Sequence, residues 1–216
     1  MTNIAPKHIE RIRELVHNYS GIILERVTSR SVDKKIHNQM KHFGVSKTDD
    51  YIMILEGFEH NSKAMDDLIA DLTVSESYFF RNPVQFEYIL ETLLPELYMR
   101  NGNKFPIRVW SAGCSRGEEA YSLAMTMLYF QRSHADVRFT INAGDINAKN
   151  LIAAREAIYN KRSQREKLAL FEERFGFKLG ELNEKGECIV ADEIKEMVSL
   201  QKLNLKNIRG LNCLAG

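Results

Sequence analysis

Small residues and acids follow one another in the segment SAGCSRGEEAY, residues 111–121, directly after the apolar run IRVW. Small residues let a ligand approach the backbone, and the N-terminus of the following helix offers N–H donors. Glu118 and Glu119 lie in the first turn of that helix, where they repel a pyrophosphate but suit a cation or a ligand rich in hydroxyl groups. Ala112 and Ser115 break the G-x-G-x-x-G spacing of dinucleotide sites. The loop therefore predicts a ligand site at the end of a strand.

A further acid, Asp145, ends the next strand pattern, FTINAGDI. An acid at this position commonly binds ribose hydroxyls, and Gly113 lets an adenosine-type cofactor approach the neighbouring loop. S-adenosylmethionine carries a sulfonium, an ammonium and a ribose but no phosphate, so it fits these acids better than a dinucleotide does. Two alternatives stay open at this point. Glu118 and Glu119 could merely complement the helix dipole, and Asp145 could cap the following helix.

The segment VSESYFFR, residues 74–81, joins a helical region to the strands and ends on an arginine. A guanidinium held there could bind a carboxylate of a cofactor or substrate through two hydrogen bonds. The alternative is that Phe79 and Phe80 pack as a hinge while Arg81 lies on the surface.

A basic stretch precedes this joint, and it is either a solvated helix face or a surface that docks an acidic partner. Its basic residues are Arg30, Lys34, Lys35, His37, Lys41 and His42. The histidines His8, His17 and His60 lack metal-ligand spacing, so no metal site is expected.

The totals exclude several protein classes. The chain has 216 residues and a formal net charge of +1, so no global field draws it onto nucleic acid or membrane. Its three cysteines are scattered and odd in number, which favours a reducing compartment. It shows neither a membrane-spanning apolar run nor a secretory signal, so we expect a cytoplasmic protein without membrane insertion. We also expect a monomer.

The elements that must position these residues follow from hydrophobic spacing and turn residues. Residues 8–73 carry apolar stripes at helical spacing and predict a small helical bundle. Asn82 and Pro83 predict the start of a new helix, as cap and first helical residue. A β-α-β-α order then predicts a parallel sheet. The expected elements are strand 107–110, helix 117–131, strand 137–143, helix 147–158, a hairpin around 184–186 and strand 197–205.

The fold class expected is α/β. It consists of an N-terminal helical bundle and a domain with a parallel sheet and a small antiparallel insertion, its sheet incomplete at the C-terminus. The expected divisions are 1–73 for the helical domain, 74–100 for the linker and first helix of the second domain, 101–216 for the cofactor-binding α/β domain and about 165–192 for the small β-subdomain.

Three motifs in this order resemble the CheR-type chemotaxis receptor methyltransferases, from about residue 10 to about residue 206. They are SESYFFR, SAGCSRGEEAYSLA and AGDINAKNLIAAREAIY. The resemblance implies that the α/β domain is a Rossmann-like S-adenosylmethionine-dependent methyltransferase domain with an inserted small antiparallel β-subdomain. It also implies that S-adenosylmethionine is the cofactor and that glutamate side chains on the cytoplasmic domain of membrane chemoreceptors are methylated. The products would be glutamate methyl ester and S-adenosylhomocysteine.

The resemblance also implies roles for individual residues. Arg81 matches the family's arginine beside the cofactor and the substrate carboxylate, and it is the expected catalytic residue. The β-subdomain matches a part that in some members holds a receptor tail, and the basic second helix matches the face that meets the receptor. The expected cofactor-binding residues are Ser75, Ser77, Arg81, Gly113, Glu118, Glu119, Asp145, Asn204 and Leu205.

The family continues past Asn-Leu into a segment of the form F-D-x-I-x-C-R-N-V-x-I-Y-F, which this sequence lacks. We therefore expect a C-terminally truncated member. The alternative function is a truncated, inactive module that binds receptor or cofactor without methyl transfer. A nicotinamide-dependent oxidoreductase is disfavoured by the missing glycine pattern, and a nucleic-acid methyltransferase by the near-neutral charge.

Overall fold

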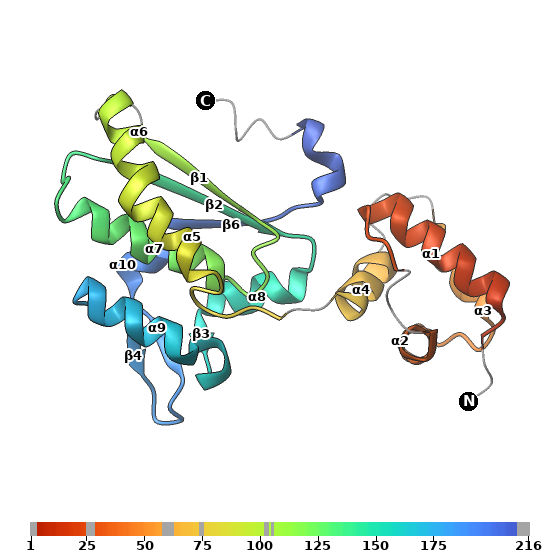
Figure 1. Ribbon diagram of the computed structural model, residues 1–216. Helices are drawn as coiled ribbons and strands as arrows, with labels where there is room; N and C mark the ends of the chain where they lie inside the picture. Colours follow the sequence, from red (N-terminus) through yellow and green to blue (C-terminus); the bar gives the residue numbers. More distant parts are fainter. Residues whose placement is uncertain are drawn as a thin grey trace. The chain divides into compact units, whose positions relative to one another are not determined.

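The computed structural model of the protein describes residues 4–24, 29–57, 63–73, 76–101, 104 and 106–210. The chain divides into two compact units, both drawn in Figure 1. The first comprises Met1–Val74, Ile146–Ala148 and Leu203–Gly216, and the second comprises Ser75–Asp145 and Lys149–Lys202.

The first unit is built from helices with buried apolar faces, as the stripes predict. Its described helices are α1 (Pro6–Ser20), α2 (Ser29–His42), α3 (Thr48–Leu55) and α4 (Lys63–Leu72). Ile12, Val16, Ile36 and Leu68 are completely buried at its centre. Burial of these side chains, rather than helix propensity, is the main stabilising contribution for helices this short.

The end of α1 is capped by residues from the far end of the sequence. Asn204 donates its side-chain amide to the Tyr19 carbonyl at 2.6 Å, and Lys206 donates from Nζ to the His17 carbonyl at 3.2 Å. Carbonyls in the last turn of a helix lack intrahelical partners, and a cation there also complements the helix dipole. The short 3₁₀ helix Leu205–Gly210, which begins beside Asn204, is thereby joined to the first unit.

A parallel sheet forms the centre of the second unit. Its described strands run in the order β1-β2-β6, and Figure 1 shows them side by side. The bounds are β1 (Ile107–Ala112), β2 (Phe139–Asp145) and β6 (Val198–Lys202), and helices α7 (Glu118–Gln131) and α8 (Ala148–Glu156) follow β1 and β2. In the register, Ala112 lies opposite Gly144. Asp145 is thus the last residue of β2, at the same sheet edge as the loop that leaves β1.

A helix with a wider turn precedes β1. It runs through α5 (Pro83–Tyr88), the π-helical turn η1 (Ile89–Leu93) and α6 (Leu94–Asn101). Pro83 takes the first helical position as expected, whereas Asn82 makes no side-chain cap bond. Because a π turn holds an extra residue, the apolar register shifts. Leu90 and Leu94 are buried but Leu93 remains 37% exposed.

A small antiparallel sheet follows, in the order β3-β5-β4. The expected hairpin corresponds to β4 (Gly180–Leu182) and β5 (Cys188–Val190), while β3 (Ile158–Tyr159) adds a strand from outside residues 165–192. Helix α9 (Lys161–Phe175) lies beside this sheet in Figure 1, and α10 (Asp192–Glu196) leads on to β6. Buried aromatic rings link these elements, including Phe79, Phe80, Tyr159, Phe171 and Phe175.

Candidate functional site

The loop between β1 and α7 is fastened to the end of β2. The N–H groups of Gly113 and Cys114 both donate to the Gly144 carbonyl, at 2.8 and 2.9 Å. Gly113 has φ +81° and Ser115 has φ +52°, so the loop turns back sharply before the helix. Two backbone bonds to one carbonyl hold the loop at the carboxyl edge of the sheet, where ligands bind in open α/β folds.

Gly113 and Gly117 occupy opposite environments in this loop. A Cβ on Gly117 would lie 2.9 Å from the Tyr159 hydroxyl and 3.1 Å from the Ala154 Cβ, whereas a Cβ on Gly113 would meet nothing within 4 Å. The Tyr159 hydroxyl donates to the Arg116 carbonyl at 2.5 Å, which holds this tight packing in place. The loop is therefore closed at Gly117 and open at Gly113.

Two acids lie at the open side of the loop. Glu119 is exposed and accepts a hydrogen bond from the buried Ser111 hydroxyl, with 2.6 Å between Oε1 and Oγ. Asp145 is half-buried and accepts from the backbone N–H of Ser115 at 2.8 Å. Both carboxylates are held at the edge of the sheet by short bonds to β1 and its loop, so their positions are set before any ligand arrives.

Glu118 faces the interior of the protein, unlike the adjacent Glu119, which is exposed. Glu118 is 1% exposed, and its Oε1 accepts from the Ser163 hydroxyl at 3.0 Å. Its Oε2 is buried without a hydrogen-bond partner. A buried carboxylate in this position links the start of α7 to the start of α9. The sequence does not distinguish Glu118 from Glu119, because their roles depend on which side of α7 packs against α9.

The linker that carries Arg81 is anchored to the same two helices. The Phe79 N–H donates to the Ser163 carbonyl at 2.9 Å, and the Phe80 N–H donates to the Ser122 hydroxyl at 3.0 Å. The Phe80 ring stacks on Phe171 at 3.9 Å between centroids. The packing interpretation of the two aromatics is therefore correct, and this packing fixes the backbone from which Arg81 projects.

Arg81 lies on the surface in a small cluster. Its Nη1 donates to the Glu76 carbonyl at 3.1 Å, and its Cζ is 5.9 Å from the centre of the Tyr78 ring. Arg165 lies closer to the same ring, with Cζ 3.7 Å from its centre. Spacing in the sequence does not indicate Arg165, because no local pattern connects residues so far apart in the chain.

Four further residues are predicted to contact the cofactor. Ser77 is half-buried in the linker, and Ser75 lies outside the described residues. Asn204 and Leu205 belong to the first unit, where Asn204 caps α1 as described above and Leu205 is 45% exposed. A cofactor role for these residues stays a prediction.

Cys114 lies in the loop but is unsuited to nucleophilic chemistry. Burial, and next the Asp145 carboxylate, raise the pKa of its thiol to about 12. The nucleophilic form of cysteine is the thiolate, so Cys114 is unreactive at neutral pH. Burial likewise raises the pKa of the Tyr121 hydroxyl, whose ring packs against Gly117, to about 12. Both groups are structural.

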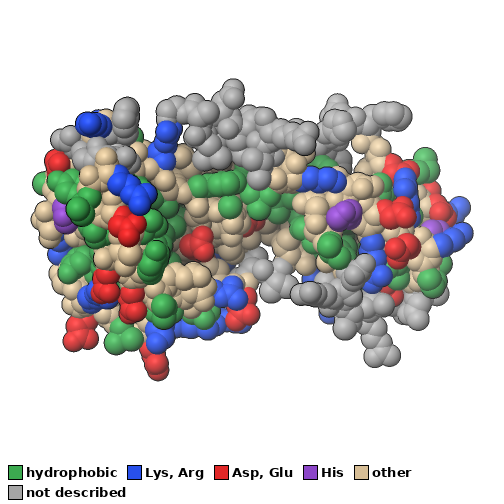
Figure 2. All heavy atoms as spheres, turned by 45° about the horizontal axis from the view of Figure 1, so that its top comes forward, with side chains coloured by type: hydrophobic (Ala, Val, Ile, Leu, Met, Phe, Trp, Pro, Cys, Tyr) green, Lys and Arg blue, Asp and Glu red, His purple; other side chains and the backbone are tan. Residues whose placement is uncertain are grey.

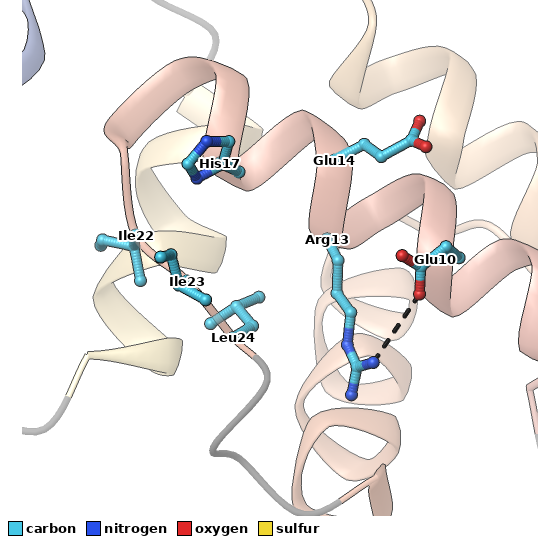
Figure 3. Close-up of a pocket in the computed structure, with 7 residues that line it drawn as sticks. All are labelled: Glu10, Arg13, Glu14, His17, Ile22, Ile23 and Leu24. Carbon is cyan, nitrogen blue, oxygen red and sulfur yellow. Dashed lines mark ion pairs between the residues drawn. The ribbon is translucent and has the colours of Figure 1, made fainter.

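Two surface grooves lie elsewhere in the described residues. One, in the second unit, has a volume of about 530 Å³ and lies between α9 and β4, with Arg165 and Leu182 among its lining residues. The other, in the first unit, has a volume of about 470 Å³. Figure 3 shows it between α1 and residues 22–24, with Arg13 paired to Glu10 at 3.7 Å and with Glu14 and His17 on the same helix. Its mixture of charges favours no single ligand class.

Among the described residues, no group of three or more acids, histidines and cysteines could hold a metal ion, and no helix has the length and hydropathy to cross a membrane. On the face shown in Figure 2, acidic and basic side chains are interspersed over both units.

The open side of the loop fits S-adenosylmethionine by its chemistry. Carboxylates accept hydrogen bonds from ribose hydroxyls and pair with an ammonium, and Glu119 and Asp145 supply two of them at the sheet edge. A Cβ on Gly113 would meet nothing within 4 Å, so a ligand can approach the backbone of the same loop. The acidic first turn of α7 opposes a phosphate group.

Comparison with known proteins agrees with this chemistry. Residues 75–211 match the family model of the CheR methyltransferase, SAM binding domain. A chemotaxis protein methyltransferase of Borreliella burgdorferi is 29% identical over 206 residues, which cover 94% of this chain and 71% of that protein. The chemotaxis protein methyltransferase of Escherichia coli is 29% identical over 202 residues, 94% of this chain and 67% of that one. The chain thus belongs to the CheR methyltransferase family and has S-adenosylmethionine as its cofactor.

Proposed function

We propose that this protein methylates glutamate side chains on chemotaxis receptors, giving glutamate methyl ester and S-adenosylhomocysteine. The observation that carries the proposal is the anchoring of Arg81 to the cofactor helix. Backbone bonds from Phe79 and Phe80 reach Ser163 and Ser122, and Ser122 lies one turn after Glu118 and Glu119 on α7. The segment bearing the guanidinium is therefore attached to the helix that begins at the cofactor loop.

We assign cofactor binding to the open side of the loop. Gly113 gives the adenosine part access to the backbone, while Glu119 and Asp145 accept its hydroxyl and ammonium hydrogens. When bound, the cofactor supplies an electrophilic methyl group on a sulfonium. Ser75, Ser77, Asn204 and Leu205 are further cofactor contacts by family resemblance. Glu118 has a positioning role in this scheme, because its carboxylate is buried against Ser163.

Arg81 holds the substrate carboxylate in this proposal. A glutamate side chain is already an anion at neutral pH, so the protein needs no general base to activate it. The guanidinium orients one carboxylate oxygen and leaves the other to react. The work done by the protein is then positioning and exclusion of water rather than proton transfer.

Two surfaces are assigned to receptor recognition. On α2 the exposed side chains Lys34, Lys41 and His42 present positive charge to an acidic receptor surface. The groove between α9 and β4 offers a site for an extended receptor segment. We expect the protein to act as a monomer in the cytoplasm, on the cytoplasmic domain of a membrane receptor.

The test combines cofactor binding with methyl transfer. Calorimetry with S-adenosylhomocysteine measures the first, and transfer of a labelled methyl group to a purified receptor cytoplasmic domain measures the second. The variant Arg81→Ala is expected to lower turnover about 100-fold or more, by misplacing the carboxylate, with a smaller loss of affinity for S-adenosylhomocysteine. The exposed Arg162, changed to Ala, is the matched control and should keep turnover within about twofold.

Each outcome of this test has a distinct meaning. Absence of S-adenosylhomocysteine binding would refute the assigned cofactor site. Binding without transfer in the unmodified chain would favour the alternative of a module that binds receptor or cofactor without catalysis. Near-normal turnover in the Arg81 variant would remove the role assigned to that residue.

A further inference from the structure

We propose that Arg165 is a specificity-determining residue, which binds a second acidic side chain of the substrate located about one helical turn from the methylated glutamate. This inference rests on the proposed function and extends it from the reacting carboxylate to its neighbour. The observation that supports it is that the guanidinium groups of Arg81 and Arg165 lie near the same aromatic ring, that of Tyr78.

The contacts make one cluster of these residues. The Arg165 guanidinium carbon lies 3.7 Å from the centre of the Tyr78 ring, a stacking distance, and that of Arg81 lies 5.9 Å from it. Glu76 contacts both arginines, because its carbonyl accepts from Arg81 at 3.1 Å and its carboxylate faces Arg165 at 3.5 Å. Stacking on an aromatic face holds a planar guanidinium in a set orientation while leaving its edge N–H groups available.

Backbone strain occurs at Arg165 and at Phe80, the residue before Arg81. Arg165 itself has φ 44° and ψ 175°, at a kink that divides α9 into two helical segments. Phe80, immediately before Arg81, has φ 51°. Non-glycine residues rarely adopt positive φ, and they keep it where the surrounding structure enforces it, often at binding sites. Here the Phe79 N–H bond to the Ser163 carbonyl couples the two strained segments directly.

Arg165 is accessible to a ligand. Its side chain is 40% exposed, and its ion-pair partner Glu76 is 57% exposed. Exposed ion pairs of this length contribute little, so a substrate carboxylate can replace Glu76 without a large penalty. Arg165 also lines the groove of about 530 Å³ between α9 and β4. A substrate segment that reaches Arg81 and continues toward this groove therefore passes Arg165.

The chemistry indicates a pair of carboxylates on one helical face. Arginine binds carboxylates in a bidentate manner, and two arginines beside one ring provide two such sites. Side chains three or four residues apart on a helix have Cβ atoms about 5–6 Å apart, so one helical face can present two carboxylates to two neighbouring arginines. The inferred substrate is thus a helix with a second acid four residues from the target glutamate.

The experiment uses the full chain with S-adenosylhomocysteine bound and two helical peptides. One peptide carries Glu at the target position and Glu four residues away, and the other carries Gln at that second position. By calorimetry we expect the unmodified chain to bind the Glu–Glu peptide about tenfold more tightly than the Glu–Gln peptide, as one charged hydrogen-bonded pair warrants. Arg165→Ala should abolish this preference while leaving affinity for the Glu–Gln peptide within about twofold.

Further variants separate recognition from folding. Arg165→Lys keeps the charge and should restore part of the preference, while Arg162→Ala should keep all of it. Four results would overturn the inference: no preference in the unmodified chain, no binding of either peptide, an unchanged preference in Arg165→Ala and Arg165→Lys, or an equal loss for both peptides. If S-adenosylhomocysteine binds and methyl transfer occurs but the peptides are not distinguished, only this inference fails. If S-adenosylhomocysteine does not bind, the proposed function fails first.

Discussion

The first turn of α7 has an open side and a closed side, and neighbouring residues of the same type lie on each. Glu119 is exposed and bonded to Ser111 of β1, while Glu118 is buried and bonded to Ser163 of α9. Consecutive helical residues point about 100° apart, so two adjacent acids can face different surroundings, as these two do. Glu119 is exposed at the sheet edge, where we propose that it binds the cofactor, whereas Glu118 is buried and joins α7 to α9.

The two glycines of the loop show the same division. Both have positive φ, but Gly117 is surrounded by Tyr159, Ala154 and Tyr121, and Gly113 has open space above it. The comparison shows that the residue type in a motif does not by itself reveal whether the residue is needed for packing or for ligand access. A glycine can be required for close packing inside the protein or for access from outside.

The largest expected effect comes from adding a methyl group at each glycine. Gly117→Ala combines left-handed strain with overlap against the Tyr159 hydroxyl at 2.9 Å, and should lower the free energy of unfolding by about 3 kcal/mol or more. Gly113→Ala meets only the strain and should cost about 1–2 kcal/mol. Denaturant unfolding followed by circular dichroism measures both. Equal losses in the two variants would contradict the division into closed and open sides.

The second largest effect is a difference between Glu118 and Glu119 in their influence on stability and on cofactor affinity. Glu118→Ala leaves a buried space and an unpaired Ser163 hydroxyl, so we expect a loss of about 1–3 kcal/mol in stability and little change in affinity for S-adenosylhomocysteine. Glu119→Ala should weaken that affinity about tenfold or more, with a smaller change in stability. Calorimetry and denaturant unfolding together give the comparison.

A third glutamate variant sharpens this result. Glu119→Gln keeps an acceptor for the Ser111 hydroxyl and removes only the charge, so any loss of affinity it shows belongs to the carboxylate itself. A weaker affinity in the Glu118 variant than in the Glu119 variant would reverse the roles assigned here.

The smallest effect is a pH dependence on the closed side. The pKa of Cys114 is raised from 9.0 to about 12 by burial and by Asp145. Below pH 9 the thiol is protonated in both the folded and the unfolded chain, so its contribution to the free energy of unfolding is fully present. Above pH 9 the thiol loses its proton in the unfolded chain but keeps it in the folded chain. The free energy of unfolding therefore falls as the pH rises, by about 0.8 kcal/mol at pH 9.5, and stops falling once the folded pKa is passed. Unfolding at pH 7.5 and 9.5 measures this fall, and Cys114→Ala should reduce it. An unchanged fall in that variant would assign the pH dependence to other groups.

Much of the fold follows from local patterns in the sequence. The stripes of the first unit predict helices that the structure contains, and the strand-loop-helix order predicts the parallel pairing of β1, β2 and β6. The strand β3 was missed because Ile158 and Tyr159 are too short a run to show alternation, and only pairing with β5 defines it. The exposure of Leu93 cannot be read from helical spacing, because a π turn changes the register of the helix.

The candidate site, like the fold, could be predicted only in part from the sequence. Local spacing was sufficient to locate Gly113, Glu119 and Asp145 at one sheet edge, because the carboxyl ends of neighbouring parallel strands meet there. It was not sufficient to separate Glu118 from Glu119, since both alternatives agree with acids in a first helical turn. Nor could it bring Arg165 beside Tyr78, a contact made by packing α9 onto the linker.

The sequence alone determined the family, the cofactor chemistry and the elements that carry the motifs, because these depend on residue types at short, fixed spacings. Tertiary structure alone decided which of two adjacent glutamates is buried, which of two loop glycines has neighbours, and which arginines share the Tyr78 ring. Those outcomes depend on contacts between segments far apart in the chain, and such contacts arise from the packing of whole helices and strands rather than from any local pattern.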